Sequence, residues 1–244
     1  MSKPEISPTP VNNTEKVEQA IDVLYEDNHL LVVNKRPGDL VQGDQTGDQP
    51  LLEKAKAYIK IKFQKPGKVF LGVVHRLDRP TSGVVVFART SKALTRLNAQ
   101  FKSRTTQKNY WAIVEGHPNE KQRFLEHWLV RNTNKNKSFA YAKEVPQSKQ
   151  AQLDYQTHVP LKKYTCLNIN LHTGRHHQIR AQLSAIGMPI KGDLKYGAKR
   201  SNPNGSIHLH ARTLTIDHPT TKERLTFTAN PPKDALWQAC LDAC

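Results

Sequence analysis

The sequence predicts an α+β protein, a single domain built on a mixed, largely antiparallel β-sheet that helices flank. Short runs rich in β-branched and aromatic residues recur along the chain, as is typical of strands. These runs follow one another more often than they alternate with helical segments, which favours antiparallel pairing. No internal repeat and no shift in composition marks a second domain, and 244 residues suffice for one large core.

The first elements follow a lead over residues 1–18 that is rich in Pro, Ser, Asn and Thr. We expect this lead to be disordered, so that the folded domain spans residues 19–244. The segment IDVLYEDNHLLVVNKRPG predicts two strands with a turn at Glu26–Asn28. After a polar loop, Leu51–Phe63 has the composition of a helix, and Pro66-Gly67 stops it.

The next run, Gly72–Thr90, reads GVVHRLDRPTSGVVVFART. Its apolar ends predict two strands of the sheet core, joined by the polar segment HRLDRPTSG. Asp78 lies in that segment between Arg76 and Arg79. Charged groups at the mouth of an apolar structure are costly to hold without a purpose, so Asp78 is a candidate functional residue.

The rest of the chain continues the pattern of strands and short helices. Ser91 is expected to cap a helix over residues 91–104, with Leu94, Leu97 and Phe101 on its apolar face. Further strands are predicted over residues 107–116, 123–132, 138–145, 151–159, 164–172, 207–217 and 224–229. A helix is predicted over residues 175–187, and another after Pro231-Pro232.

The charge balance indicates a polyanionic partner. The chain has 37 Lys and Arg against 21 Asp and Glu, which gives a formal net charge of +16. Nucleic acid is the commonest polyanion for such a protein. The alternative is that the excess lysines only keep the protein soluble.

Cysteine usage and the N-terminus bear on the cellular location. The three cysteines, Cys166, Cys240 and Cys244, include no CxxC pair, which argues against a disulfide scaffold or a structural zinc site. The N-terminus lacks the apolar core of a signal peptide, and no apolar run reaches the length of a membrane span. We therefore expect a soluble, cytoplasmic protein.

Six histidines in the second half raise the question of a metal site: His172, His176, His177, His208, His210 and His218. No carboxylate or cysteine stands beside them in a recognised ligand spacing, so we favour structural or RNA-facing roles and predict no metal. The chain also lacks GxxxxGK[ST], a GxGxxG after a strand, and GxSxG. We predict no small-molecule cofactor.

The segment LHTGRHHQIRAQL combines a strand end with a helix start. Thr173-Gly174 ends the strand and Arg175 opens the helix, a placement in which backbone N–H groups and a basic side chain face phosphate. Arg180 lies about one turn further, amid apolar residues of the helix. It is either a surface residue of an amphipathic helix or an inward partner for a buried acid, for which Asp78 is the candidate.

The segment HRLDRPTSG resembles the HRLDxxTSG signature of the RluA-type RNA pseudouridine synthases. Other segments are similar to motifs of that family in the expected order: VVNKRPG, KNYWAIVEG, TGRHHQIRAQL with GMPIKGDLKYG, and LHARTLTIDHP. The resemblance spans about residues 20–232. The first motif departs from Lys-Pro-x-Gly, because this chain has Lys35-Arg36-Pro37-Gly38. The segment ahead of it is too short for the S4 RNA-binding domain of many relatives, so we expect a catalytic domain without one.

The resemblance implies a pseudouridine synthase fold and roles for single residues. Asp78 is then the catalytic carboxylate, Arg180 its partner, and Arg76 a wedge that enters the RNA stack. Tyr110 resembles the tyrosine that stacks on uracil, whereas the strand alone equally favours a core aromatic. We expect RNA contacts from a basic surface that includes Lys35, Arg76, Arg79, Lys108 and Arg175.

The sequence therefore favours an isomerase that converts specific uridines in rRNA or tRNA stem–loops to pseudouridine. We expect it to act as a monomer and without a membrane. A non-catalytic basic RNA-binding protein is the alternative, in which Asp78 is dispensable. A metal-dependent hydrolase built on the histidines is the third hypothesis.

Overall fold

The computed structural model describes residues 21–43 and 47–243, and the predicted lead over residues 1–18 lies outside them. Eleven strands of the described chain join in one sheet. The strands are β1 (Val23–Glu26), β2 (Leu30–Lys35), β3 (Gly72–Val73), β4 (Ser82–Ala88), β5 (Gln107–Glu115), β6 (Gln122–Asn132), β7 (Lys137–Tyr141), β8 (Lys149–Pro160), β9 (Tyr164–Leu171), β10 (Leu209–Asp217) and β11 (Arg224–Thr228).

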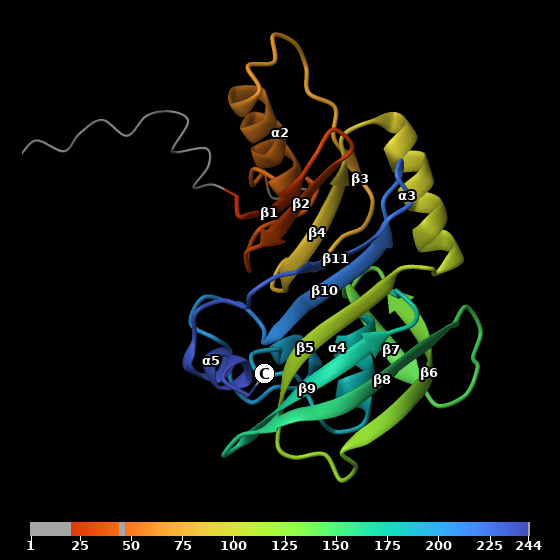
Figure 1. The fold of residues 1–244 in the computed structure, drawn as a ribbon. Coiled ribbons are helices and arrows are strands. Elements are labelled where there is room, and N and C mark those ends of the chain that lie inside the picture. The colour runs from red at the N-terminus through yellow and green to blue at the C-terminus, as the bar shows by residue number, and fades with distance from the viewer. Residues whose placement is uncertain (1–20, 44–46, 244) are drawn as a thin grey trace, which may run out of the picture.

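The order of the strands places the C-terminal part of the chain in the middle of the sheet. The path is β1-β2-β4-β10-β5-β9-β8-β6-β7, with β3 paired to β4 and β11 to β10. Strands β4 and β10 run parallel, and the other strand pairs of the described sheet are antiparallel. The predicted mixed, largely antiparallel sheet is confirmed. Figure 1 shows β10 joining the β1-β2-β4 part to the part that begins with β5.

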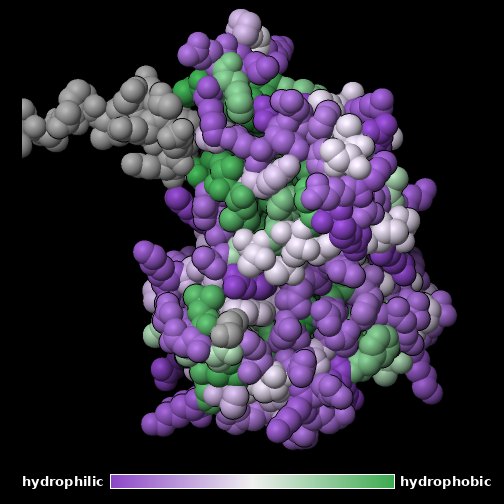
Figure 2. Space-filling model, in the orientation of Figure 1, coloured by the Kyte–Doolittle hydropathy of each residue, from purple (hydrophilic) through white to green (hydrophobic). Residues whose placement is uncertain are grey.

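Four α-helices of the described residues flank this sheet: α2 (Leu51–Lys62), α3 (Ser91–Ser103), α4 (Gln178–Ala185) and α5 (Ala235–Leu241). In Figure 1, α2 and α3 accompany the part of the sheet that contains β4, and α4 lies behind the part that contains β5 and β9. Figure 2 shows a mostly hydrophilic surface on this side, with apolar residues in separate small patches. None of the described helices is both long enough and apolar enough to cross a membrane.

Burial on both faces explains the uninterrupted apolar runs of β2 and β4. Leu31 and Val33 of β2 belong to the larger core cluster, which extends to Leu183 of α4. Their neighbours Leu30 and Val32 point to the opposite face and join a second cluster with Leu97 of α3. A strand covered on both sides has no position where a polar residue meets water, so the alternation of a half-exposed strand is absent.

Gly83 fixes the start of β4 against β10. Its φ of +118° lies in the region that favours glycine, and a Cβ here would lie 2.3 Å from the carbonyl oxygen of Ala211. At the same junction, Ser82 Oγ lies 2.9 Å from Nδ1 of the buried His210. The TSG end of the HRLDRPTSG segment is thus the point where the segment locks onto the central strand.

Two helix starts differ from the sequence-based expectations. The cap of α3 is Thr90 rather than Ser91, since Thr90 Oγ1 accepts a hydrogen bond from the Ala93 N–H at 3.1 Å. Helix α4 begins at Gln178 rather than at Arg175. The Gln178 side chain accepts hydrogen bonds from the Arg175 N–H (3.0 Å) and from Thr173 Oγ1 (2.7 Å), which holds residues 173–177 in a turn before the helix.

One strand is also shorter than expected. The strand predicted over residues 138–145 ends at Tyr141 as β7. A turn follows, in which the Ser148 hydroxyl donates to the Val145 carbonyl oxygen at 2.6 Å. Strand β8 then starts at Lys149.

Candidate active site

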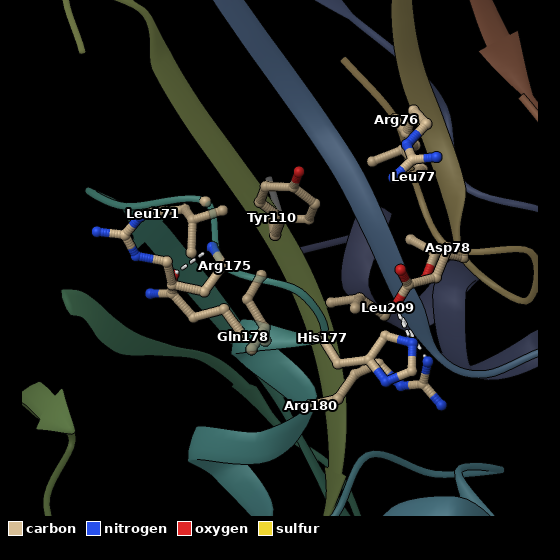
Figure 3. Close-up of a pocket in the computed structure, with 13 residues that line it drawn as sticks. Arg76, Leu77, Asp78, Tyr110, Leu171, Arg175, His177, Gln178, Arg180 and Leu209 are labelled. Carbon is tan, nitrogen blue, oxygen red and sulfur yellow. Dashed lines mark hydrogen bonds and ion pairs between the residues drawn. The ribbon is translucent and has the colours of Figure 1, made fainter. Parts of the chain in front are cut away.

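A pocket of about 120 Å³ lies where the HRLDRPTSG segment, β5 and the start of α4 meet. Figure 3 shows the side chains that surround it. Its lining residues are Arg76, Leu77, Asp78, Thr81, Tyr110, Leu171, Gly174, Arg175, His177, Gln178, Ile179, Arg180 and Leu209. The structure therefore brings together Arg76, Asp78, Tyr110, Arg175 and Arg180 of the residues that the sequence predicted.

Asp78 and Arg180 form an ion pair at this pocket. The distance from Arg180 Nη1 to Asp78 Oδ2 is 3.0 Å. Arg180 is 5% exposed, so the alternative of a surface arginine on an amphipathic helix is wrong. The Asp78 side chain retains 28% exposure and is open to the pocket. An inward-facing arginine thus fixes the position of the carboxylate while one side stays accessible.

Asp193 completes the support of Arg180, and sequence reasoning missed this role. Arg180 donates from Nε to Asp193 Oδ2 (2.7 Å) and from Nη2 to Oδ1 (2.9 Å). Burial disfavours the charged guanidinium, but hydrogen bonds and charges from Asp193 and Asp78 outweigh it and raise the pKa of Arg180. Such two-point contacts fix the plane of the guanidinium. The available signal was the GDLKYG segment, which resembled the family without a role for its aspartate.

His177 faces the same carboxylate as a neutral ring. Burial, followed by repulsion from Arg180, lowers the pKa of His177 to about 2. Its Nδ1 lies 3.0 Å from the hydroxyl oxygen of Tyr196, and that oxygen already accepts a hydrogen bond from the Ser138 N–H at 2.8 Å. Because a carboxylate only accepts hydrogen bonds, we assign the histidine proton to Nε2, which lies 3.5 Å from Asp78 Oδ2, so that Nδ1 accepts from the Tyr196 hydroxyl.

Tyr110 forms another wall of the pocket and is at the same time a residue of the core. It is 9% exposed and belongs to the larger core cluster, yet it also lines the pocket with Asp78. Burial, followed by the negative charge of Asp78, raises the pKa of Tyr110. The ring is therefore an uncharged aromatic surface beside the carboxylate.

The predicted RNA-binding residues occupy different positions around the pocket. Arg76 is exposed at the pocket, and Arg79 pairs with Asp48 at 2.5 Å on the surface. Arg175 extends away from Asp78 in Figure 3, and its Nε donates to the Gln150 carbonyl oxygen at 3.0 Å. The Lys108 side chain is partly buried, and burial, followed by the charge of Arg104, lowers its pKa.

Lys35 is not part of this surface, which corrects the prediction. It is 0% exposed, and its ammonium donates to the carbonyl oxygens of Arg36 (2.9 Å) and Arg79 (3.1 Å). The Arg79 carbonyl also accepts from the Gly38 N–H at 2.8 Å. The side chain turns inward because these carbonyl oxygens need a donor, so Lys35 fastens the turn after β2 to the segment that contains Asp78.

The six clustered histidines bind to separate partners. His172 contacts Asp154, His176 contacts Ser138, His177 contacts Tyr196, His208 contacts Asp234, His210 contacts Ser82, and His218 contacts Asp27, all within 3.0 Å. The part of the chain that the structure describes contains no group of three or more His, Cys, Asp or Glu placed to hold a metal ion. These contacts fit the structural reading of the histidines.

Comparison with known proteins decides the family. The model of a protein family described as RNA pseudouridylate synthase matches residues 29–185, more than half of the chain. A relative from Zymomonas mobilis, ribosomal large subunit pseudouridine synthase D, is 33% identical over 238 residues, covering 93% of this chain and 74% of the relative. The chain belongs to the RNA pseudouridylate synthase family. Members of this family are isomerases that act on RNA, and the predicted RluA-type resemblance is confirmed.

Two further proteins resemble this synthase along most of its length. The dual-specificity RNA pseudouridine synthase RluA of Haemophilus influenzae is 34% identical over 221 residues, covering 87% of this chain and 94% of the relative. The solved structure of human RNA pseudouridylate synthase domain containing 4 superposes with a TM-score of 0.75 at 22% identity, covering 94% of each chain. The latter similarity establishes the pseudouridine synthase fold.

Proposed function

We propose that this synthase isomerises uridines in stem–loops of rRNA or tRNA, with Asp78 as the catalytic carboxylate. The observation that carries the proposal is the 3.0 Å pair of Asp78 with the buried Arg180, in a pocket that Tyr110 also lines. A carboxylate acts as a nucleophile only when it is aimed at the reacting atom. Arg180 fixes the position of Asp78, and the open side of Asp78 receives the nucleotide.

The reaction moves one bond and one proton. The N1–C1′ bond of the uridine breaks, the base turns, and a C5–C1′ bond forms. The proton lost from C5 is balanced by the proton gained at N1, so product and substrate have the same atoms and no oxidant or reductant takes part. We propose that Asp78 acts beside the sugar and the base as nucleophile or electrostatic partner, without a metal or cofactor.

The uridine has to leave its stack before Asp78 can reach it. Extrusion of a base takes a few kcal/mol, least where the base is unpaired in a loop. We propose that Arg76, exposed at the pocket, fills the vacated place in the RNA as a planar wedge. Tyr110 then offers its uncharged ring for stacking on the extruded uracil.

The RNA class follows from the names of the relatives. One is named for the large ribosomal subunit, so we propose rRNA as the first candidate, and another is named for dual specificity, which leaves room for a second RNA such as tRNA. Arg79, Lys108 and Arg175 surround the pocket, and we propose that they contact phosphates of that RNA. We also propose that the synthase acts as a monomer in the cytoplasm.

Turnover on unmodified RNA tests the proposal. Transcripts of large-subunit rRNA and of tRNA that contain [5-³H]uridine release tritium when pseudouridine forms. We expect release with the wild-type protein and a loss of more than about a thousandfold for Asp78→Asn, because only the carboxylate charge is removed. RNA binding should stay within about tenfold, or 1.4 kcal/mol, since phosphate contacts provide the affinity.

The same experiment separates the alternative function. A non-catalytic RNA-binding protein would bind these transcripts without tritium release, and Asp78→Asn would then change nothing. Measurable turnover by purified Asp78→Ala would contradict the assignment of Asp78. Mapping of pseudouridines in RNA from cells with and without the protein identifies the uridine.

A further inference from the structure

A second, larger hollow adjoins the catalytic pocket. It has a volume of about 820 Å³, and Leu171 at the end of β9 lines both hollows. We call it the Arg104 groove. Its lining includes Arg104, Thr106, Lys108, Asn109, Asn170 and Thr213. Among the described residues, no aspartate or glutamate lines this groove. Its charge is therefore wholly positive.

Three cations gather where the groove meets the catalytic pocket. A Cβ on Gly174 would lie 3.7 Å from Lys108 Nζ, so the Lys108 ammonium lies beside the backbone of that pocket. Arg104 lies close enough to repel the other two cations. The pKa of Lys108 and that of Arg175 are both lowered, mainly by burial and secondly by the charge of Arg104. The ion pairs of the described chain include none of the three.

Neighbouring cations without an acid repel one another, and an anion between them removes that repulsion. Phosphate also matches the donors available here, a guanidinium and an ammonium. The synthase acts on RNA. When one nucleotide of an RNA strand occupies the catalytic pocket, the next nucleotide of that RNA lies near the adjoining groove. The charge and the position of the groove thus fit an RNA backbone better than a free anion.

The groove also offers neutral hydrogen-bonding groups. Thr106 is 6% exposed, and its hydroxyl oxygen has no hydrogen-bond partner within the described structure. Asn109 and Asn170 face each other across β5 and β9, with Asn109 Nδ2 donating to Asn170 Oδ1 at 3.1 Å. Amides and hydroxyls in this density suit the ribose and base edge of a nucleotide, which present both donors and acceptors.

We propose that the Arg104 groove binds a nucleotide adjacent to the target uridine, with its phosphate held between Arg104 and Lys108. This inference rests on the proposed function, because it takes the RNA strand to enter the catalytic pocket. It adds a residue, Arg104, that the sequence motifs do not include. Arg104 is the C-cap of α3, in the left-handed conformation with φ of +60°. Its side chain is exposed and can contact the RNA.

Two matched variants test the role of Arg104. Arg104→Gln removes one charge from the groove, and Lys102→Gln removes one charge two residues away, on an exposed position of α3 outside it. The probe is an unmodified rRNA stem–loop that the wild-type protein binds. We expect Arg104→Gln to weaken binding about three- to tenfold and to lower the slope of log Kd against log salt by about 0.7–0.9, the value for one phosphate. Lys102→Gln should stay within about twofold.

A scan with neutral methylphosphonates then locates the contact. At one linkage beside the target uridine, the substitution should weaken wild-type binding by the same factor as Arg104→Gln, and the two changes together should have no larger effect. Equal behaviour of the two glutamine variants would overturn the inference. An Arg104→Gln effect that persists at every substituted linkage would do the same, as would tight, Arg104-dependent binding of free UMP.

The failure of this inference is distinguishable from the failure of the proposed function. Binding is measured without turnover, so the phosphate result is obtained whether or not the stem–loop is modified. Tritium release by the wild-type protein, combined with equal binding of both glutamine variants, contradicts only the groove. Absence of tritium release on every transcript contradicts the proposed function.

Discussion

Arg180 and Arg76 both line the pocket that contains Asp78, but their surroundings differ. Arg180 is 5% exposed and donates to two carboxylates through three hydrogen bonds. Arg76 is exposed, and the ion pairs of the described chain do not include it. The inner arginine has one fixed orientation, whereas the outer one keeps its donors available for another molecule.

The difference extends to the residues around each arginine. The inner side consists of Arg180, Asp193, His177 and Tyr196, which hold one another by hydrogen bonds and exclude water. Removal of one partner from such a buried pair is strongly destabilising, because a charge is left without compensation. Substitution of an exposed charge at the rim changes the free energy of unfolding little, typically by under about 1 kcal/mol. One region therefore fixes geometry, and the other provides affinity.

The largest expected effect on the free energy of unfolding comes from Asp193 on the inner side. Asp193→Asn keeps the shape of the side chain but leaves the buried guanidinium with one carboxylate instead of two. We expect the free energy of unfolding to fall by about 3 kcal/mol, measured by urea denaturation. The control is Asp217→Asn, which breaks an exposed pair with Arg224 and should stay within about 1 kcal/mol. Equal losses in the two variants would erase the contrast between the regions.

The buried Lys35, whose ammonium donates to the Arg79 carbonyl oxygen, provides a pH-dependent test of a second buried charge near Asp78. Burial, against the raising effect of Asp39 and Asp78, lowers the pKa of Lys35 to about 8. In the unfolded chain its pKa is about 10.4. Between these values the unfolded chain holds a proton that the folded chain lacks, so the unfolding free energy rises with pH in this window. Compared with Lys35→Met, the wild-type protein should gain about 3 kcal/mol between pH 8 and pH 10.5.

Urea denaturation of both proteins at several pH values measures this gain. Lys102→Met serves as the control, because its exposed ammonium should leave the difference flat. Parallel pH profiles of the wild-type protein and Lys35→Met would show that the folded protein does not depress this pKa.

A smaller effect is expected from the hydroxyl of Tyr196. Tyr196→Phe keeps the ring over the Arg180 guanidinium, at 5.0 Å, but removes the donor that fixes the tautomer of His177. We expect turnover to fall about tenfold, or 1.4 kcal/mol, with an unchanged KM. His177→Gln keeps an amide donor near the Nε2 position, whereas His177→Asn does not. Turnover should therefore be higher for the glutamine variant, and equal turnover would contradict the orientation of Nε2–H toward Asp78.

The smallest expected effect is that of metal removal. We expect excess EDTA to leave turnover unchanged on an RNA that folds without magnesium, because Asp78 is held by an arginine and a neutral histidine rather than by a cation from solution. Turnover that EDTA abolishes and zinc restores would revive the histidine-based metalloenzyme.

The sequence predicted the parts of the fold and site that depend on local patterns. Apolar runs marked the strands, and the charges of the HRLDRPTSG segment marked Asp78. The pairing with Arg180 was one of two alternatives, because periodicity places a residue on a helix face without showing what covers that face. The 5% exposure of Arg180 and its pairs with Asp78 and Asp193 decide it.

The errors arose where a long side chain reaches away from its own segment. Lys35 was expected in the basic surface around Asp78, but its ammonium bonds to a carbonyl oxygen 44 residues later. Asp193 was missed for the same reason, since the sequence does not show which arginine lies opposite an isolated acid. Arg104 lies outside every motif, and only the fold shows that it lines a groove next to the catalytic pocket.

The junction of Gly83 with Ala211 has a consequence for the newly made chain. Ser82 and His210, which meet there, are 128 positions apart, so the segment that carries Asp78 cannot pair with β10 until the chain has been synthesised past His210. Contacts over such a separation form slowly, because a long loop has to close first. During synthesis the N-terminal strands therefore exist without a complete catalytic centre. The protein can modify RNA only after β10 has paired with β4.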